Sequence, residues 1–239
     1  MPDLLSLLGV GAGAGVAGFT GIHDHSTLAA KVISHWKLNE ASGTRADSNS
    51  GTHDLTDSGS TGSRTAKIGD GADLAGSTQL YHADHADFTP AGAWAFTGWV
   101  LFDTLTASTQ YTVLGKWGAA GQRSYRFARS SGNKWYIGIS GDGTAETSKS
   151  RTDDPSTGTW YFFYVYYDGS NIGISINNDT AQTASYSSGT YNGTNQFQLG
   201  AQNGTLRMDG GLDSVTFWNT TLTSGELTDL YNSGNGLDW

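Results

Sequence analysis

The most informative absence is cysteine, of which the 239 residues contain none. Disulfide bonds, thiolate metal sites and a cysteine nucleophile are therefore excluded, and the redox environment of the chain stays open. Glutamate is scarce as well, because only Glu40, Glu146 and Glu226 occur among the 22 acidic residues. The remaining acidic residues are aspartates, which favour turns and loop sites over long helices.

Positive charge and long apolar runs are also scarce. Thirteen basic residues against 22 acidic ones give a net charge of −9, which repels phosphate backbones, so we expect no nucleic acid partner. No run of about 18 apolar residues occurs without interrupting glycine, so we expect no membrane-spanning helix. The apolar first ten residues carry Asp3 where a secretory signal has Lys or Arg, which argues against a signal peptide.

Aromatic residues and glycines are plentiful, at 12% of the chain and 34 residues respectively. This composition favours strands that pack face to face and are joined by tight turns. The run 160–167 lacks polar alternation, which predicts a strand buried on both faces. In all, β-rich runs predict strands over residues 32–38, 94–102, 111–116, 124–129, 134–140, 160–167, 171–177, 196–200 and 212–219.

Local signals predict one late helix and several tight turns. Thr223 and Glu226 have the spacing of a capping box, and Gly234 is expected to end the helix that they begin. The dipeptide Asn203-Gly204 predicts a hairpin turn, which is typical of antiparallel strands. Many strands with one helix near the end indicate a β-sandwich.

The first 30 residues differ in composition from the rest. Residues 11–18 consist of glycine, alanine and one valine, which cannot bury much side-chain surface. We therefore predict a Gly/Ala-rich N-terminal arm over residues 1–30 and one globular domain over residues 31–239. The arm is expected either to stay disordered or to order against a partner, and in the second case it would tie protomers into a homo-oligomer.

Four blocks of residues occur in a recognisable order and spacing. They span 36–51, then 67–76 with 96–100, then 158–178, and finally 199–231. Together they resemble the laminin-G-like jelly-roll domains of the concanavalin A-like lectin and glucanase superfamily, over about residues 35–234. The resemblance implies an all-β fold with two antiparallel sheets packed as a jelly-roll sandwich and one short C-terminal helix.

The resemblance also implies a role. Domains of this superfamily usually bind glycans or proteins, some carry a structural calcium ion, and catalysis is the exception. The glucanases place a Glu-x-Asp-x-x-Glu arrangement on one strand, so that two carboxylates lie about 5 Å apart across the scissile bond. This chain has no such arrangement, and its three glutamates are scattered. We therefore expect no enzymatic activity.

Aspartates and histidines supply the candidate metal ligands. By resemblance, Asp47 and Asp213 are the first candidates for a structural calcium ion, with backbone carbonyls as further ligands. The alternative is that both aspartates only form turns and cap strands. The segments 82–87 and 23–25 both contain histidine and aspartate pairs that could bind a metal. In 23–25 the two histidines would point to one side of a strand and could form a metal site with their copies in a trimer. For both segments, solvated polar loops are the favoured alternative.

Sugar binding requires aromatic rings that stack on pyranose faces, beside polar groups that bind hydroxyls. The candidate rings in or near loops are Trp117, Tyr186 and Tyr191. The candidate polar partners are Asn192, Asn195 and Gln202. Core packing is the alternative role for each ring.

The sequence therefore predicts a non-catalytic surface module that recognises glycans or a cell-surface receptor. The lack of cysteine and of a signal peptide, together with the arm, favours an exterior virion component, such as a phage capsid decoration or tail protein, over a secreted protein. The arm would then contact other virion proteins. A purely structural virion or surface protein is the main alternative, and a secreted polysaccharide-active enzyme module is a weaker one.

Overall fold

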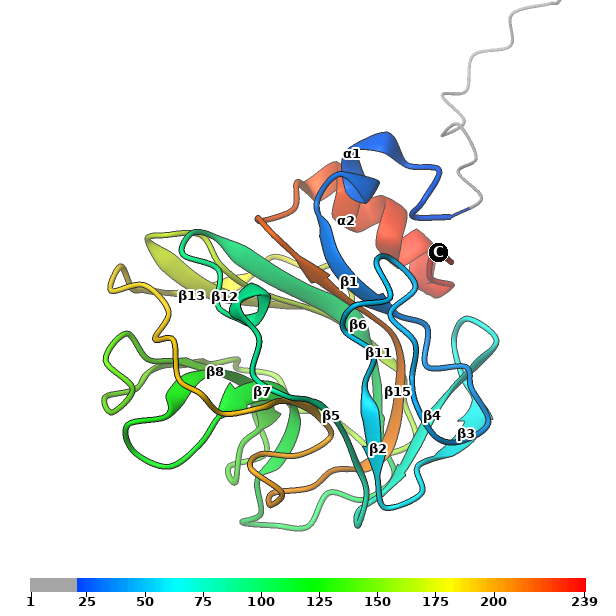
Figure 1. Ribbon diagram of the computed structural model, residues 1–239, viewed down its shortest axis with the longest axis horizontal. Coiled ribbons are helices and arrows are strands. Elements are labelled where there is room, and N and C mark those ends of the chain that lie inside the picture. The colour runs from blue at the N-terminus through cyan, green and yellow to red at the C-terminus, as the bar shows by residue number, and fades with distance from the viewer. Residues whose placement is uncertain (1–20) are drawn as a thin grey trace, which may run out of the picture.

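Two antiparallel sheets packed face to face make up the molecule, as the computed structural model of residues 21–239 shows (Figure 1). The eight-stranded sheet has the order β13 (Gln182–Ser185), β12 (Asn171–Ile176), β11 (Tyr161–Tyr167), β6 (Trp94–Phe102), β15 (Asp209–Trp218), β4 (Asp70–Ala75) and β3 (Gly62–Thr65), with β1 (Val32–Trp36) also paired to β15. The seven-stranded sheet has the order β10 (Thr147–Ser150), β9 (Trp135–Ile139), β8 (Arg123–Arg129), β7 (Tyr111–Trp117), β14 (Phe197–Leu199), β5 (Gln79–His82) and β2 (Thr56–Ser58).

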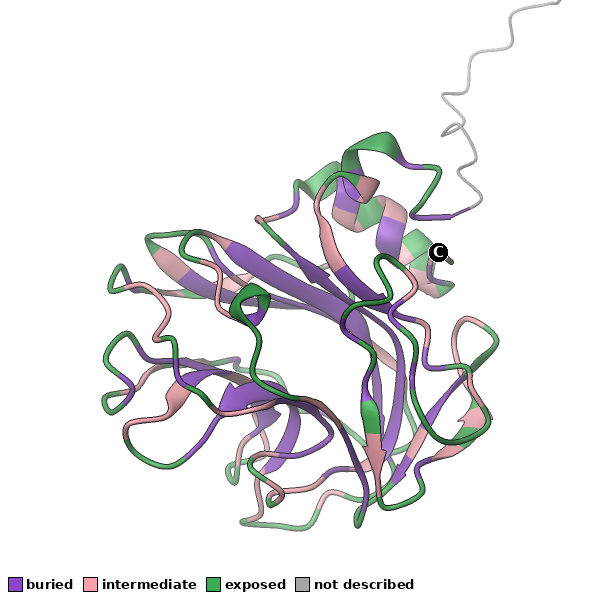
Figure 2. Ribbon diagram, in the orientation of Figure 1, coloured by how far each residue is buried: buried purple, intermediate pink, exposed green. Residues whose placement is uncertain are grey.

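The core fills the space between the sheets, where the central strands are buried and most of the connecting loops are exposed (Figure 2). Aromatic side chains from both sheets stack in its centre. Phe96 of β6 and Phe217 of β15 lie 4.2 Å apart between ring centroids, and Phe96 and Phe197 of β14 lie 5.6 Å apart. Burial of one such ring contributes about 1.5–3 kcal/mol, so the two sheets are held together by packing without any covalent link. The predicted all-β sandwich is confirmed.

A second apolar cluster covers the outer face of the eight-stranded sheet. Phe162 and Tyr164 of β11 point outward and are buried, whereas Phe163 and Val165 point into the core. The cover consists of α2 (Ser224–Tyr231), α1 (Ser26–Ala29) and the C-terminal residues, which lie above this sheet in Figure 1. The prediction that 160–167 is buried on both faces is therefore confirmed over most of its length.

The predicted elements agree with the structure, with small shifts at their ends. Each of the nine predicted runs overlaps a strand, and 94–102 has the bounds of β6. The capping box of α2 is present, but Asn232, with a φ of 46°, caps its end instead of Gly234. A short helix, η1 (Ala86–Phe88), and a last turn, η2 (Asn232–Gly234), complete the elements. Within residues 21–239 no helix is long and apolar enough to cross a membrane.

Of the predicted arm over residues 1–30, residues 1–20 lie outside the described part of the chain. The last ten residues of the arm contact the domain. Ile22 is buried and its N–H donates to the carbonyl of Asp238 at 2.6 Å. Lys31, which follows the arm, pairs with Glu226 of α2 at 2.6 Å. Residues 21–31 therefore lie beside α2 and the last residues of the sequence.

Candidate functional site

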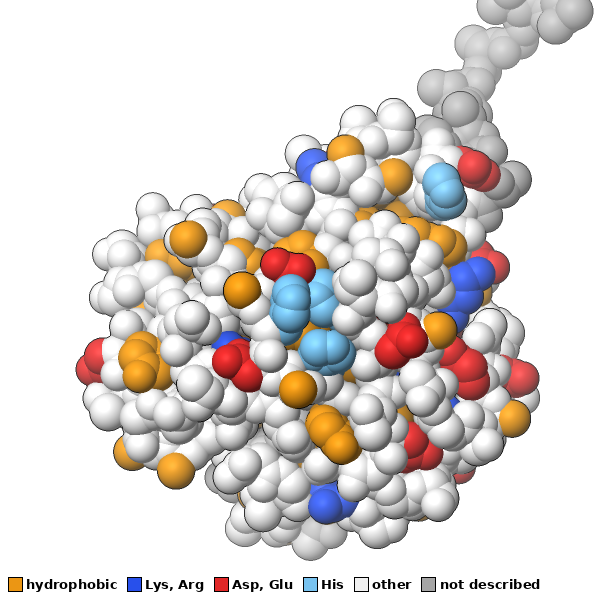
Figure 3. Space-filling view, viewed as in Figure 1, with side chains coloured by type: hydrophobic (Ala, Val, Ile, Leu, Met, Phe, Trp, Pro, Cys, Tyr) orange, Lys and Arg blue, Asp and Glu red, His pale blue; other side chains and the backbone are white. Residues whose placement is uncertain are grey.

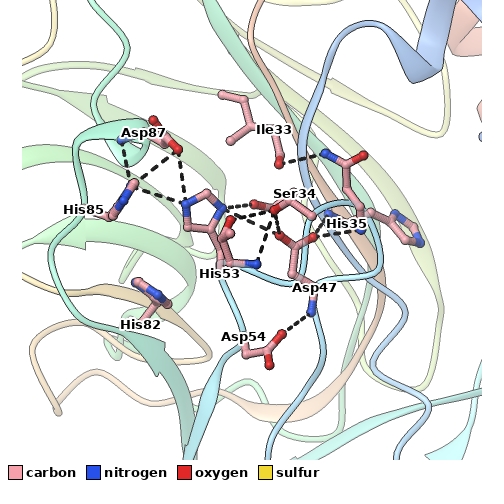
Figure 4. Close-up of polar contacts among 12 residues, drawn as sticks. Ile33, Ser34, His35, Asp47, His53, Asp54, His82, His85 and Asp87 are labelled. Atoms are coloured by element: carbon pink, nitrogen blue, oxygen red, sulfur yellow. Dashed lines mark hydrogen bonds and ion pairs between the residues drawn. The ribbon is translucent and has the colours of Figure 1, made fainter.

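Histidine side chains gather on one face of the sandwich (Figure 3). His53 lies in the loop before β2, His82 ends β5, and His85 directly precedes η1. The ring centroids of His53 and His85 are 4.8 Å apart, and those of His53 and His82 are 5.5 Å apart. Asp87 of η1 joins them, so that three separate segments contribute to one group of side chains (Figure 4).

The potential ligand atoms of His53, His85 and Asp87 converge. Nε2 of His53 lies 3.3 Å from Nδ1 of His85 and 3.3 Å from Oδ2 of Asp87, and the last two atoms are 3.4 Å apart. The His53 side chain is only 2% exposed, whereas those of His85 and Asp87 are about half exposed. The group is thus anchored on one side and open to solvent on the other. We call these three residues the histidine cluster.

Behind His53, two side chains fix the orientation of its ring. Nδ1 of His53 lies 2.7 Å from Oγ of Ser34 and 3.6 Å from Oδ2 of Asp47 (Figure 4). Burial raises the pKa of Asp47, but hydrogen bonds led by those from His53 and Ser50 outweigh this effect and hold the pKa well below its ordinary value. Asp47 is therefore ionised, and it holds the His53 ring in place from the interior.

The chain of contacts from Ser34 through His53 to Asp87 has the composition of a serine hydrolase triad, but its geometry is unsuited to catalysis. Ser34 is fully buried within β1, so no substrate carbonyl reaches its hydroxyl. The ring is also reversed, since Nδ1 faces the serine and Nε2 faces the aspartate. The arrangement is better suited to holding the histidine than to activating the serine.

A second candidate site lies on the outer face of the eight-stranded sheet. A groove of about 440 Å³ is lined by residues of β11, β12, the turn after β12 and the start of α2. Tyr164 and Tyr166 form its floor, with ring centroids 5.0 Å apart. The ring of Tyr166 lies over Gly173, because a Cβ placed on that glycine would be 2.4 Å from Cζ of Tyr166. We call this site the tyrosine groove.

Polar groups line the rim of the tyrosine groove. Asp168, Ser175, Asn178 and Asp179 all contribute to its lining. Tyr166 is partly exposed, and the burial of the rest of its side chain raises the pKa of its hydroxyl. The groove thus combines an apolar floor with donors and acceptors at its edge, as small-molecule sites generally do.

The sequence-predicted sugar ligands lie near the ends of the seven-stranded sheet. Trp117 and Tyr186 are buried, with 3% and 9% exposure, which leaves little of either ring accessible. Tyr191 is partly exposed and packs on Gly143, and Asn192 is exposed and accepts a hydrogen bond from Lys116 at 3.4 Å. Trp117 is the last residue of β7, whereas Tyr191 and Asn192 lie in the loop before β14, which contacts the loops after β7 and β9.

Arg126 of β8 connects part of this predicted set. Its guanidinium lies 4.5 Å from the centre of the Trp117 ring and donates to Oε1 of Gln202 at 2.8 Å. It also pairs with Glu146 at 2.8 Å. The sixth predicted residue, Asn195, is partly buried beside Gly118, and its amide nitrogen has no partner among the described residues. A ligand role for these residues stays a prediction.

The two predicted calcium ligands differ in how much of each carboxylate is already engaged. The oxygens of Asp47 accept hydrogen bonds from two backbone N–H groups and from Ser50. In Asp213, Oδ2 accepts from the backbone N–H groups of Lys67 and Ile68, whereas the buried Oδ1 has no partner within residues 21–239. Burial raises the pKa of Asp213 to about 7. Calcium binding at these residues stays a prediction.

In the second histidine pair, His23 and His25, the buried His25 contacts α2. Nε2 of His25 lies 3.1 Å from Oδ2 of Asp229 in α2, and Nδ1 contacts the hydroxyl of Thr27 at 3.1 Å. His23 is exposed, and its ring lies 6.0 Å from that of Trp239. The two rings thus have different surroundings in this chain.

Sequence reasoning identified His82, His85 and Asp87 as metal-capable but missed His53. The missing residue lies about 30 positions earlier, and only the pairing of β2 with β5 brings it to the others. Because β2 has three residues and little apolar character, no periodic signal predicts that pairing. Tyr166 was missed for a different reason, since it belongs to a run that is otherwise core.

Solved structures with the same fold include binding domains of bacterial toxins. One is a structure of botulinum neurotoxin type C, whose cell entry depends on interaction with two ganglioside molecules. It has 12% sequence identity to this chain and a TM-score of 0.68, and the match covers 87% of this chain and 52% of the toxin chain. The binding domain of Paraclostridial Mosquitocidal Protein 1 has 10% identity and a TM-score of 0.70, with coverage of 86% and 53%. The binding domain of botulinum neurotoxin DC in complex with rat synaptotagmin II has 12% identity and a TM-score of 0.66, with coverage of 86% and 52%.

These similarities concern the fold, and this chain spans about half the length of the toxin structures. No curated protein matches the sequence. A family model described as concanavalin A-like lectin/glucanases superfamily matches residues 74–228, which is more than half of the chain. That segment includes β5 to β15, which belong to both sheets, and most of α2. The chain therefore belongs to the concanavalin A-like lectin/glucanases superfamily.

Proposed function

We propose that this chain is a non-catalytic surface module that binds glycans, free or on a cell-surface receptor, in the tyrosine groove. The observation that carries the proposal is the ring of Tyr166, which is partly exposed and supported from below by Gly173. A ring fixed in this way offers its outer face to the apolar face of a pyranose. The carboxylates and amides of Asp168, Asn178 and Asp179 at the rim suit the sugar hydroxyls.

The structural neighbours support binding as the role of the fold. Botulinum neurotoxin type C interacts with two gangliosides, and the binding domain of neurotoxin DC has been solved with synaptotagmin II. We place glycans first because the groove of this chain pairs an aromatic floor with a polar rim.

The absence of catalysis is part of the proposal. Glu146 is paired with Arg126, and Glu226 is engaged in the capping box of α2 and with Lys31. Neither glutamate belongs to the lining of the tyrosine groove. Incubation with a panel of polysaccharides should therefore release no new reducing ends, and measurable release would contradict this part of the proposal.

A glycan array tests the binding proposal. Full-length protein should give saturable binding to at least one glycan class, and Tyr166→Ala should weaken that binding at least about tenfold, or about 1.4 kcal/mol. Tyr191→Ala is the matched variant, because it removes a partly exposed tyrosine at the predicted loop site and should leave the affinity unchanged. Each array is run with calcium and with EGTA, which tests the calcium prediction at Asp47 and Asp213.

The outcomes separate the sites. Loss of binding in Tyr191→Ala instead of Tyr166→Ala would move the site to the loops around Trp117 and overturn the groove. Loss with EGTA would support a calcium-dependent lectin. No binding by the full-length protein to any glycan would overturn the proposed function and favour a structural role.

The finer proposal is that the module lies on the exterior of a virion and assembles through its first residues. It is supported by the lack of cysteine and by the Gly/Ala-rich composition of residues 11–18. Light scattering should give an oligomeric mass for the full chain and a monomeric mass for residues 21–239, and equal masses would contradict assembly through the arm. Mass spectrometry of particles purified from the source should then detect the chain.

A further inference from the structure

We propose that the histidine cluster is a tetrahedral site for a divalent transition metal, Zn²⁺ first, with His53, His85 and Asp87 as ligands and a fourth position open to solvent. His53 comes from the loop before β2, whereas the other two ligands come from the segment between β5 and β6. The ion would therefore fasten together two segments that are about 30 residues apart in the sequence.

The spacing of the three ligand atoms fits an ion better than hydrogen bonds. Their separations are 3.3, 3.3 and 3.4 Å, close to an equilateral triangle. Tetrahedral zinc with ligand distances of about 2.0–2.1 Å requires separations of about 3.3–3.4 Å between ligand atoms. A charge-assisted hydrogen bond between imidazolium and carboxylate would instead bring the two atoms to about 2.7–2.9 Å.

The contacts around the two rings leave nitrogens that an ion could use. Nδ1 of His53 faces Oγ of Ser34 at 2.7 Å and Oδ2 of Asp47 at 3.6 Å, and a proton on Nδ1 beside these oxygens leaves the lone pair on Nε2. Nδ1 of His85 accepts from the backbone N–H of Asp87 at 3.3 Å and lies 3.3 Å from Nε2 of His53. An ion at the centre of the triangle would replace these two long contacts, which the half-exposed ring of His85 has room to release.

Ser34 and Asp47 lie where metal-binding histidines usually have a partner on the far nitrogen, at 2.7 Å and 3.6 Å from Nδ1 of His53. A carboxylate on the far nitrogen of such a histidine fixes the ring and raises its basicity. Asp47 is itself fixed, because its backbone N–H donates to Asp54 at 2.8 Å and its side chain accepts from the N–H of His35 at 3.1 Å (Figure 4). The buried half of the site is therefore already ordered before an ion binds.

The exposed half of the site leaves room for a fourth ligand. A pocket of about 530 Å³ adjoins the cluster and is lined by His53 and Asp87 together with Ser50, Thr52 and Thr89. Water or an oxygen of a bound molecule can reach the ion from that pocket. Two nitrogen ligands and one oxygen ligand favour zinc or its neighbours over calcium and magnesium, which prefer oxygen alone.

Titration calorimetry with zinc chloride tests the proposal on full-length protein without a histidine tag, after treatment with EDTA. Wild type should bind one equivalent of zinc, and His85→Ala and Asp87→Asn should each weaken binding at least about tenfold. Both side chains are half exposed, so both variants should fold, and circular dichroism checks this. His23→Ala is the matched control, because it removes an exposed histidine outside the cluster and should bind as wild type does.

Cobalt gives a second readout that is independent of affinity. Co²⁺ bound to wild type should show the intense visible absorption of tetrahedral coordination, which zinc then displaces, and the His85→Ala spectrum should lack it. Absence of stoichiometric zinc binding in wild type at micromolar concentration would overturn the proposal. Equal binding by wild type and the double variant His85→Ala/Asp87→Asn would overturn it as well, because the ion would then lie elsewhere.

Discussion

At the scale of single residues, the lack of a side chain at Gly173 shapes the tyrosine groove. A Cβ at this position would lie 2.4 Å from Cζ and 2.6 Å from the hydroxyl of Tyr166. The far end of the ring would have to move away, and because that ring is partly exposed it can do so at small cost. The glycine therefore matters more for the shape of the site than for the stability of the sheet.

We predict that Gly173→Ala lowers the free energy of unfolding by less than about 1 kcal/mol yet weakens glycan binding at least about tenfold. Urea denaturation and the glycan array measure the two quantities. Gly92→Ala is the control, because a Cβ there meets no atom within 4 Å. Unchanged affinity in Gly173→Ala would show that the ring position is irrelevant to binding.

At the scale of elements, Glu226 links the start of α2 to Lys31, which directly precedes β1. Its carboxylate accepts from the N–H of Thr223 at 2.8 Å and pairs with Nζ of Lys31 at 2.6 Å. Burial raises the pKa of Glu226, but Lys31 and the Thr223 cap outweigh it and lower the pKa to about 2 from the ordinary 4.5. Because the folded pKa is the lower one, this contribution to stability is present above pH 4.5 and is lost as the pH falls toward 2.

Replacing Glu226 with Gln should therefore lower the free energy of unfolding by about 1–2 kcal/mol at pH 7, since the cap is weakened and the ion pair is lost. The difference from wild type should shrink between pH 4.5 and pH 2, because wild type then loses its charge. Denaturation curves across this range measure it. A difference that stays constant down to pH 2 would mean that the charge of Glu226 contributes nothing to the free energy of unfolding.

The sequence predicts the central strands better than the edge strands. Strands such as β6 and β11 are recognisable because they lie in the middle of a sheet and consist of apolar and aromatic residues. The edge strands β3, β10 and β13 alternate between partly buried and exposed residues and carry no strong signal. The capping box of α2 is local and was predictable, whereas its end at Asn232 depends on a left-handed turn that asparagine adopts less often than glycine.

The candidate sites depend on contacts between distant segments, which sequence alone does not fix. The segment 82–87 contains two ligands of the histidine cluster, but His53 joins them only through strand pairing. Trp117 and Tyr186 are in or near loops, as expected, yet their rings are buried because Arg126 and Tyr167 pack against them. Exposure depends on the tertiary neighbours of a ring, and a single sequence does not reveal those neighbours.

At the scale of the whole molecule, the first and last described segments hold each other in place. Trp239 stacks on the buried ring of His35, with centroids 4.7 Å apart, and the carbonyl of the preceding Asp238 accepts from Ile22. We predict that Trp239→Ala lowers the free energy of unfolding by about 1–2 kcal/mol and the midpoint of thermal unfolding by about 3–6 °C. Calorimetry measures both, and an unchanged midpoint would show that the last residues are not part of the cooperative unit.

Because these two segments lie side by side, the order of the strands along the chain could be changed by circular permutation. Gly21 and Trp239 are so close that a Cβ on the glycine would lie 2.6 Å from the backbone of the tryptophan. A linker of a few glycines would join them into a continuous loop, and the chain could then be opened at an exposed turn such as that around Gly169. Circular permutation, or insertion of the whole sandwich into a surface loop of another protein, should thus leave its strand pairing intact.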